Sequence, residues 1–327
     1  MRAILMHEFG PAETLRFAEV ADPLPGPGQV RIAVAAAGVH LLDAAIRAGT
    51  ATGPFAPPRL PMIPGREVAG VVDALGDGAP PAWLGRRVVA HLGMASGGYA
   101  ERAVCAATSL HALPDGLGFE AAVAMIGTGR TALAILDVAA LSADDVVLVT
   151  AAAGGLGTLL VQAARRVGAA VVGVAGGPAK VDRVRELGAT AAVDYTRPGW
   201  PDEVRAALAG RDITVVLDGV GGDEGRAALE LIGMGGRLVL YGWAAGKPTP
   251  LTADDLYTYG MTASAAIGPR LTGRPGGLRD FEERSLAAAA AGTLVPVVGQ
   301  TFPLARAADA HTAVETRATV GKTVLTP

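Results

Sequence analysis

Residues 1–119 alternate short runs of apolar and β-branched residues with clusters of Gly and Pro. The clusters, at 23–28, 53–64 and 76–81, are typical of turns. Short strands separated by many turns predict a small, partly open β-barrel. The strands expected from this pattern cover residues 29–35, 67–75, 87–91 and 99–105.

From about residue 119 the pattern changes, because short apolar runs begin to alternate with longer segments of helical spacing. A helix is expected at 119–141, with an interruption near 127–129. Strands that alternate with helices predict a doubly wound parallel sheet. The expected strands are 146–150, 170–175, 191–194, 214–218, 237–241 and 261–266, and the expected helices are 156–167, 179–187, 202–209 and 224–231.

The C-terminal part of the chain mixes helix and strand patterns again, and we expect it to return to the first domain. The chain has 327 residues, 50% hydrophobic and 18% charged, so it is long and apolar enough for two buried cores. The sequence thus predicts an α/β protein. A parallel-sheet domain, residues 120–267, is inserted between the two parts of a β-rich domain, residues 1–119 and 268–327.

Composition and charge narrow the partners that the protein can have. A formal net charge of −3 and a pI near 6.0 give no positive surface for nucleic acid or an anionic membrane. The uncharged stretch 146–164 contains Gly, Thr and Gln residues, which favours a buried strand and turn over a membrane span. A single cysteine argues against a disulfide framework and is typical of a reducing cytosol, so a cytoplasmic protein is expected.

A glycine-rich turn, AAAGGLG, follows the apolar strand at 146–150 and opens an amphipathic helix. This is the context that a dinucleotide-binding fingerprint requires, although an ordinary strand–helix turn is the alternative. Its glycines permit a tight turn and a close approach of the backbone to a pyrophosphate at the helix N-terminus. We therefore predict cofactor contacts from Ala151, Gly154, Gly155, Leu156 and Gly157.

The next strand indicates which nicotinamide cofactor binds. An NAD site usually has Asp or Glu about 20 residues after the fingerprint, where it binds the ribose 2′-hydroxyl. Here the strand ends VVGVAGGPAK, with no acidic residue before Asp182. Gly176 and Gly177 leave room for a phosphate, and Lys180 follows at the start of the next helix. This arrangement predicts NADPH, with a solvated surface lysine as the alternative interpretation of Lys180.

With these motifs the chain resembles the medium-chain dehydrogenase/reductase superfamily, in its zinc-free quinone oxidoreductase (ζ-crystallin-like) branch. Residues 38–49, GVHLLDAAIRAG, resemble that branch's G-x-N-x-x-D-x-x-x-R-x-G signature, except that His40 stands where Asn is usual. The segments PMIPGREVAGVVDALG (61–76), AAAGGLG (151–157), VDY (193–195) and ETRATVGKTVL (315–325) are similar to the branch in the same order.

The resemblance implies a GroES-like catalytic barrel and a Rossmann cofactor domain. It also implies NADPH-dependent reduction of quinones or similar conjugated carbonyls, by a homodimer that pairs through the strand at 261–266. By the resemblance, Lys180 and Tyr195 hold the 2′-phosphate, and Gly155 and Leu156 contact the pyrophosphate. The nicotinamide half lies along Thr131, Val220, Tyr241 and Gly242. The residues that line the cleft between the domains are His40, Asp43 and Arg47.

A metal site is not expected. Where zinc alcohol dehydrogenases carry G-H-E, this chain has Gly65, Arg66 and Glu67, and an arginine cannot bind zinc. Cys105 stands alone in the sequence, and the five histidines show no ligand spacing. The chemistry then belongs to the cofactor, and the protein supplies orientation and a proton. His40 is the clearest general-acid candidate, with Tyr241 or water as alternatives and a purely orienting histidine as the other interpretation.

Two other functions remain open at this point. The same fold and cofactor also serve enoyl reduction of a thioester or an α,β-unsaturated ketone. A binding protein without turnover is the third possibility, although a complete cofactor site argues against it. The physiological acceptor depends on loops such as 51–61 and 267–277, whose conformation cannot be deduced from their residues.

Overall fold

The computed structural model describes residues 1–51, 58–273 and 277–327. Residues 52–57 and 274–276, which belong to the two loops expected to shape the acceptor site, lie outside the described residues. The described residues form two compact units, one of Met1–Gly127 with Ser285–Pro327 and the other of Thr128–Arg284. We call these unit 1 and unit 2.

The chain passes between the units inside helical segments. The first crossing lies in a π-helical turn (Met125–Gly129), and the second lies in α10 (Gly277–Ala290). The crossings differ from the domain limits expected at residues 119 and 267. Helix α2 (Phe119–Ala124) belongs to unit 1 because it packs on that unit's sheet, and ion pairs from α10 to α3 (Arg130–Ala139) hold the start of α10 in unit 2.

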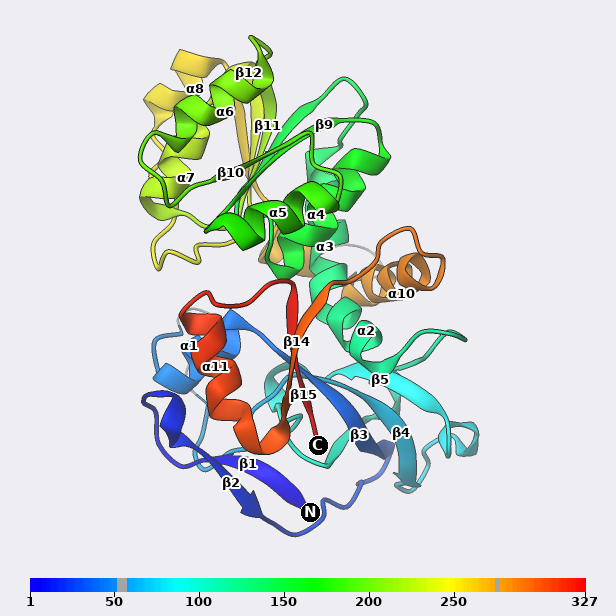
Figure 1. Ribbon diagram of the computed structural model, residues 1–327. Helices are drawn as coiled ribbons and strands as arrows, with labels where there is room; N and C mark the ends of the chain where they lie inside the picture. Colours follow the sequence, from blue (N-terminus) through cyan, green and yellow to red (C-terminus); the bar gives the residue numbers. More distant parts are fainter. Residues whose placement is uncertain (52–57, 274–276) are drawn as a thin grey trace. The chain divides into compact units, whose positions relative to one another are not determined.

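Unit 1 is built on a sheet with the strand order β14-β15-β3-β4-β5-β7, in which β6 also pairs with β3 (Figure 1). All the pairs are antiparallel except β14 with β15. A separate antiparallel pair joins β1 (Arg2–Met6) and β2 (Leu15–Glu19). The strands of the larger sheet are β3 (Gln29–Val39), β4 (Glu67–Leu75), β5 (Arg87–His91), β6 (Arg102–Ala106), β7 (Leu110–Ala112), β14 (Val298–Pro303) and β15 (Lys322–Thr326).

The strands expected at 67–75 and 87–91 are confirmed with their bounds. Strand β3 continues beyond the expected end at residue 35, because its end, which is rich in Ala and Gly, pairs with β4 and β15. The strand expected at 99–105 begins only at Arg102. Two helices of this unit, α1 (Leu41–Ala48) and α11 (Ala307–Glu315), pack against each other.

Unit 2 is a parallel sheet with the order β10-β9-β8-β11-β12-β13, which confirms the doubly wound arrangement. Because the order reverses between β8 and β11, the carboxyl ends of these strands form the switch point at which such sheets bind ligands. The strands are β8 (Val146–Val149), β9 (Ala170–Ala175), β10 (Ala191–Asp194), β11 (Ile213–Asp218), β12 (Ile232–Leu240) and β13 (Thr262–Ala265). The helices besides α3 are α4 (Gly155–Arg166), α5 (Pro178–Glu186), α6 (Trp200–Leu208), α7 (Gly222–Leu229), α8 (Ala253–Tyr259) and α9 (Pro269–Thr272).

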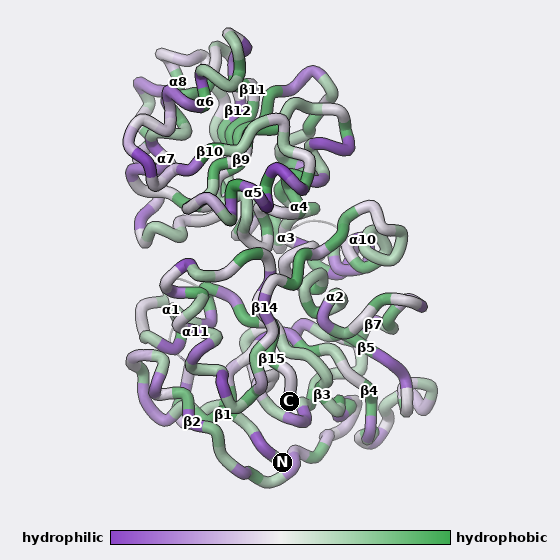
Figure 2. The backbone as a smooth tube through the Cα atoms, in the orientation of Figure 1, coloured by the Kyte–Doolittle hydropathy of each residue, from purple (hydrophilic) through white to green (hydrophobic). Residues whose placement is uncertain are grey.

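Each unit has its own buried core. In unit 1, apolar residues of β3, such as Val30 and Ile32, are fully buried against those of the neighbouring strands. In unit 2, the core lies between the sheet and its helices and includes Leu148 and Val216. Figure 2 shows apolar residues along β11 and β12 of unit 2 and hydrophilic residues on α5. Burying each Val or Leu side chain contributes about 1.5–3 kcal/mol to folding.

One helical segment of the described chain, Phe119–Ala139, is long and apolar enough to cross a membrane. Its most apolar window is 67% buried inside the protein, which is typical of a core helix. The uncharged stretch 146–164 forms the buried strand β8, a turn and most of α4, as expected from its glycines.

Candidate active site

Strand register brings three polar residues together in unit 1. Strands β15 and β3 pair with Thr323 opposite Val39, and β3 and β4 pair with Val68 opposite Ala37. Lys322 and Glu67 begin their strands at this end, and His40 directly follows β3. The ends of three strands therefore carry an ammonium, a carboxylate and an imidazole side by side.

The three side chains are in direct contact, and we call them with Asp43 the His40 cluster. Lys322 Nζ donates to Glu67 Oε2 at 2.8 Å and lies 2.6 Å from His40 Nε2. His40 Nε2 is also 3.0 Å from Glu67 Oε1. The side chains of Glu67 and Lys322 are 0% and 4% exposed, whereas that of His40 is 27% exposed. His40 is thus the member of the cluster that solvent or a ligand can reach.

Two glycines make room for the Glu67 carboxylate. A Cβ atom at Gly38 would collide with Oε2, and one at Gly127 would collide with Oε1. Any side chain at either position would push the carboxylate out of its contacts with Lys322 and His40. These glycines belong to the site although they carry no chemistry.

Helix α1 places the other predicted residues of this unit. Asp43 Oδ2 accepts from the backbone N–H of His40 at 2.9 Å and lies 3.3 Å from its Nδ1. Arg47, one turn further on, makes two hydrogen bonds to Glu315 of α11, at 3.1 and 2.6 Å. Asp43 and Arg47 are buried within unit 1, so their contacts orient His40 and tie α1 to α11.

The buried polar contacts continue behind Asp43. Tyr99 Oη donates to Asp43 Oδ2 at 3.4 Å and lies 3.2 Å from His311 Nε2. Burial lowers the pKa of His311 to about 4, and burial together with Asp43 raises the pKa of Tyr99 well above its usual value. Both side chains are therefore neutral near neutral pH.

The charges of the His40 cluster shift one another's protonation. Burial disfavours the imidazolium, but the Glu67 and Asp43 carboxylates outweigh burial and the Lys322 ammonium, so the pKa of His40 is raised above 6.5. Burial alone would raise the pKa of Glu67, yet His40 and Lys322 hold it well below its usual value. The pKa of Asp43 is lowered in the same way, mainly by His40.

No group of three or more His, Cys, Asp or Glu side chains in the described parts of the chain could hold a metal ion. Arg66, at the position of the zinc enzymes' histidine, donates from Nε to the Gly93 carbonyl at 3.2 Å. Cys105 is buried, and burial raises the pKa of its thiol to about 12, so it remains protonated.

The glycine turn of unit 2 joins β8 to α4 at the switch point. Ala151 has a φ of 47°, a left-handed conformation that few non-glycine residues adopt. A Cβ atom at Gly157 would collide with the carbonyl of Ala151, so this glycine allows the helix to lie close against the strand. Gly154 precedes the first residue of α4, Gly155, and Leu156 follows it. Gly155 and Leu156 therefore lie in the first turn of α4, and the N–H groups of a helix's first turn are the ones that can bind an anion.

The residues predicted to hold the 2′-phosphate follow the strands β9 and β10. Gly177 directly precedes α5 with a φ of 87°, and Lys180 lies in the first turn of that helix. The Tyr195 hydroxyl lies 3.1 Å from the position of a Cβ on Gly176. Asp194, which the sequence reasoning missed, accepts from the Gly177 N–H at 2.9 Å and thereby fixes this turn. Its position at the end of a predicted strand was the feature of the sequence that could have identified it.

Asp218, also missed, organises the loop after β11. Its Oδ1 accepts from Thr150 Oγ1 at 2.8 Å and from the Val220 N–H at 2.9 Å, and its Oδ2 accepts from Thr249. Asp218 ends a strand at the switch point, which is where a sequence search could have found it. This carboxylate fixes Val220, one of the residues predicted along the nicotinamide.

Tyr241 and Gly242 lie against the same loop. A Cβ at Gly219 would collide with the Tyr241 ring, and one at Gly242 would lie 2.9 Å from the Gly219 carbonyl oxygen. The Tyr241 hydroxyl donates to the Thr150 carbonyl at 3.2 Å, and burial with Asp218 raises its pKa. Thr131, the other residue predicted along the nicotinamide, lies in the first turn of α3. The predicted catalytic residues thus divide between unit 1 and unit 2.

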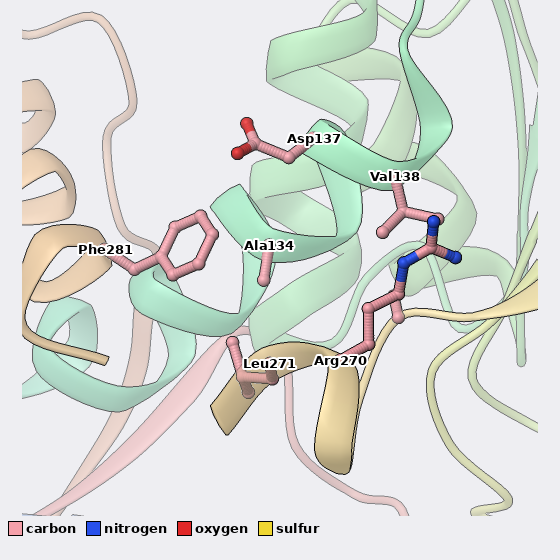
Figure 3. A pocket seen from close by; sticks show the side chains of 7 residues that line it. Ala134, Asp137, Val138, Arg270, Leu271 and Phe281 are labelled. Carbon is pink, nitrogen blue, oxygen red and sulfur yellow. The ribbon is translucent and has the colours of Figure 1, made fainter. Parts of the chain in front are cut away.

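Unit 2 also contains a cavity of about 290 Å³ that the sequence did not predict. Figure 3 shows its lining side chains, with those of α3 on one side and Arg270 and Leu271 of α9 on the other. One lining residue, Asp137, pairs with Arg284 at 3.3 Å. The cavity is lined by Ala134, Asp137, Val138, Ala266, Arg270, Leu271 and Phe281, none of which was a predicted site residue.

Comparison with known proteins gives matches along both units. The alcohol dehydrogenase GroES-like domain family matches residues 26–115, and the zinc-binding dehydrogenase family matches residues 155–281. Quinone oxidoreductase of Sus scrofa is 31% identical over 99% of this chain and 97% of its own length. A 2-haloacrylate reductase of Burkholderia sp is 32% identical over 99% of this chain and 98% of its own.

Comparison with solved structures also finds quinone oxidoreductases. The crystal structure of Escherichia coli quinone oxidoreductase complexed with NADPH matches with a TM-score of 0.88 and 27% identity, and all of both chains is covered. These matches confirm the GroES-like and Rossmann folds that the resemblance implied. The chain belongs to the quinone oxidoreductase (ζ-crystallin-like) branch of the medium-chain dehydrogenase/reductase superfamily.

Proposed function

We propose that this protein is an NADPH-dependent reductase that transfers hydride to quinones or similar conjugated carbonyls and does not use zinc. The observation that carries this proposal is the pair of turns at the carboxyl ends of the neighbouring strands β8 and β9 of unit 2. One turn follows β8 and leads into α4, and the other follows β9, with the Tyr195 hydroxyl beside Gly176 and with Lys180 in the first turn of the helix after Gly177. Relatives named quinone oxidoreductases, one of them solved with NADPH, support the same assignment.

The residues of unit 2 fit NADPH because the missing side chain at Gly157 allows a close approach of helix and turn, and because the Tyr195 hydroxyl lies beside Gly176, where a phosphate could accept from it. The bound cofactor would supply the hydride. Lys180 and Tyr195 distinguish NADPH from NADH by contacting the additional phosphate, and the loop held by Asp218 supports the nicotinamide half. The full set of proposed cofactor contacts is Thr131, Ala151, Gly154, Gly155, Leu156, Gly157, Gly176, Gly177, Lys180, Tyr195, Val220, Tyr241 and Gly242.

His40 is our candidate for the donor of the proton that the acceptor takes up together with the hydride. It is the exposed member of a buried charge cluster, and the Glu67 and Asp43 carboxylates raise its pKa above the usual value, which favours the proton-carrying form. Tyr241 is a weaker candidate, because its hydroxyl already donates to the Thr150 carbonyl and its pKa is raised. Asp43 and Arg47 act as positioning residues, since they hold His40 and its helix in place.

The proposal that zinc is not used rests on Lys322. Its ammonium is in contact with both the His40 imidazole and the Glu67 carboxylate, two side chains of this cluster that are of the metal-ligating kind. A divalent cation at this position would meet a fixed positive charge at contact distance, and Arg66 offers no ligand in exchange.

A second activity, enoyl reduction, is favoured by one relative. The Burkholderia relative is named for reduction of 2-haloacrylate, an α,β-unsaturated acid. Hydride addition to a conjugated carbon–carbon double bond uses the same cofactor geometry and the same need for a proton. The two activities differ only in the acceptor.

We further propose a cytoplasmic homodimer. Strand β13 lies at the edge of the parallel sheet and pairs with β12 alone in the described sheet order. An unpaired strand edge is a ready surface for a second copy of the chain. The net charge of −3 gives no reason to propose a nucleic-acid or membrane partner.

The acceptor class can be tested with a panel of quinones, α,β-unsaturated ketones and enoyl thioesters, each mixed with protein and NADPH. Oxidation of NADPH is followed by its absorbance. Faster oxidation with quinones supports the leading proposal, and faster oxidation with enones or thioesters supports the second. Oxidation no faster than in protein-free controls with every acceptor would point to a binding protein without turnover.

A further inference from the structure

The contact between Lys322 and His40 restricts the protons that the two side chains can carry. Lys322 Nζ and His40 Nε2 are 2.6 Å apart, a hydrogen-bond distance that needs one donor and one acceptor. A lysine ammonium has no acceptor, and neither has a doubly protonated imidazole. The two groups therefore cannot both be charged while this contact exists.

The surrounding carboxylates decide which of the two is neutral. Lys322 Nζ also donates to Glu67 Oε2 at 2.8 Å, which favours the charged ammonium. On the other side of the ring, Nδ1 faces Asp43 Oδ2 at 3.3 Å, and a carboxylate there requires a hydrogen on Nδ1. The arrangement that satisfies these three contacts, Lys322 with Glu67, Lys322 with His40 and His40 with Asp43, is a neutral ring with its hydrogen on Nδ1 and with Nε2 accepting from the ammonium.

Glu67 offers a second position for His40. Its Oε1 is buried and, within the described residues, has no hydrogen-bond partner of good geometry, although Nε2 is only 3.0 Å away. A buried carboxylate oxygen without a donor is costly. A proton entering at Nε2 would supply that donor, and the ammonium would keep its contact with Oε2.

We propose that Lys322 holds the His40 ring in its neutral, Nδ1-protonated form, and that the ring takes its second proton only when Nε2 exchanges Lys322 for Glu67. Lys322 is thus a positioning residue that controls when His40 can serve as an acid. The proton balance is that His40 gains one proton from the solvent at Nε2 and returns to its neutral form when it gives one proton to the reduced acceptor. Only the transfer of the proton to the acceptor rests on the proposed function.

Other groups that face the cluster come from several elements. Besides Asp43 and Arg47 of α1, they are Tyr99, His91 of β5, and His311 and Glu315 of α11. Tyr99 and His311 stay neutral near neutral pH, and Arg47 is paired with Glu315. His91 accepts from the Gly93 N–H at Nδ1 and must be resolved from His40 by experiment.

The test is ¹H–¹⁵N NMR of the full chain without cofactor, observing the ring nitrogens of the five histidines as pH is varied. His40 is assigned by the signal that His40→Asn removes. We expect the wild-type ring to be the Nδ1–H form above its transition. A ring that carries its hydrogen on Nε2, or one that stays doubly protonated at pH 9, would overturn the proposal.

A variant gives the second measurement. In Lys322→Met the repelling ammonium is lost, so the His40 midpoint should rise by about 1–3 pH units. The matched control is Lys247→Met, which removes an exposed lysine of unit 2 and should leave the midpoint unchanged. An unchanged midpoint in Lys322→Met would contradict the proposal. Should that variant not fold, the wild-type ring form still decides.

This experiment is independent of turnover. If the NMR results are as expected but turnover shows no dependence on the His40 midpoint, the contact with Lys322 stands and the role of His40 in the reaction fails. If turnover does depend on the His40 midpoint, the pH at which turnover changes should shift in Lys322→Met together with that midpoint. A lysine with a purely structural role would not cause this shift.

Discussion

His40 is the exposed end of a buried group of charges, and its neighbours determine what it can do. Glu67 and Asp43 favour its charged form, whereas burial and Lys322 oppose it. The usual residue at this position of the branch's signature is Asn, which cannot change charge. The histidine therefore gives this chain a group whose hydrogen bonding depends on pH in the physiological range.

Replacing His40 with Asn should remove a pH dependence. If His40 gives a proton to the acceptor, the charged ring is the active form, and turnover falls as pH rises through its pKa. Because that pKa is raised, the fall should lie above pH 6.5. At pH values below the wild-type fall, we expect turnover by His40→Asn to be about 100-fold lower than that of the wild type. The turnover of the variant should not fall further as the pH rises. The measurement is kcat against pH, with His7→Asn, an exposed histidine of the same unit, as control.

The fold of His40→Asn should be intact, because Asn can keep the backbone contact with Asp43. A variant with the wild-type rate and pH profile would show that His40 only occupies space and that the proton comes from elsewhere.

A second prediction about a single residue concerns Lys180. A charge-assisted contact to a phosphate is worth about 1.5–3 kcal/mol, which corresponds to about tenfold or more in affinity. We expect Lys180→Ala to weaken NADPH binding by that amount and to leave NADH binding nearly unchanged, as measured by titration calorimetry. Lys247→Ala, an exposed lysine of unit 2, is the control. Equal losses for both cofactors would rule out a contact between Lys180 and the 2′-phosphate.

Among the elements, the pairing of β3 with β4 and β15 is what assembles the His40 cluster. Lys322 and Glu67 are 255 residues apart in sequence, and only the sheet brings them together. Helix α1 then begins directly after His40 and places Asp43 and Arg47 on successive turns. The cluster is therefore a property of the sheet and not of any one motif.

Local patterns predicted those parts of the molecule whose structure is local. The glycine turn, the strands β9 and β10 and the helix after the turn follow from residues within one segment, and they lie where expected. The roles of Glu67 and Lys322 were not predicted, because they depend on register between distant strands. Asp194 and Asp218 were missed although each ends a strand, because the loop N–H groups that they bind are identified only by the structure.

The close approach of β3 to Glu67 can be tested by adding one methyl group. In Gly38→Ala the Cβ would collide with Glu67 Oε2, so the buried ion pair must shift. We expect the free energy of unfolding to fall by about 1–3 kcal/mol, measured by urea denaturation. The control is Gly26→Ala, whose Cβ would meet only the flexible end of Gln29 and should change stability by less than about 0.5 kcal/mol. Equal stability of the two variants would contradict this picture of the site.

In the whole molecule, the two units carry different parts of the proposed reaction. Unit 2 holds the turns that fit NADPH, and unit 1 holds the His40 cluster. Each unit has its own core, so substitutions in one site should leave the core of the other intact. The boundaries inside the π-helical turn and α10 mean that both connections are helical.

The proposed independence from zinc is a property of the whole protein. We expect elemental analysis of the purified chain to give far less than one zinc per molecule, because Lys322 already supplies a cation beside Glu67. Treatment with a chelator should leave NADPH oxidation unchanged. Stoichiometric zinc that is lost together with activity would show that the site binds metal after all.

The central claim is hydride transfer from NADPH to a conjugated carbonyl, and steady-state kinetics with a simple quinone test it most directly. The measurement compares kcat/KM for NADPH and NADH at one saturating quinone concentration. We expect oxidation of both cofactors, with NADPH favoured by about tenfold or more through the additional phosphate contact. Equal values for the two cofactors, a preference for NADH, or no oxidation above the protein-free rate would contradict the account.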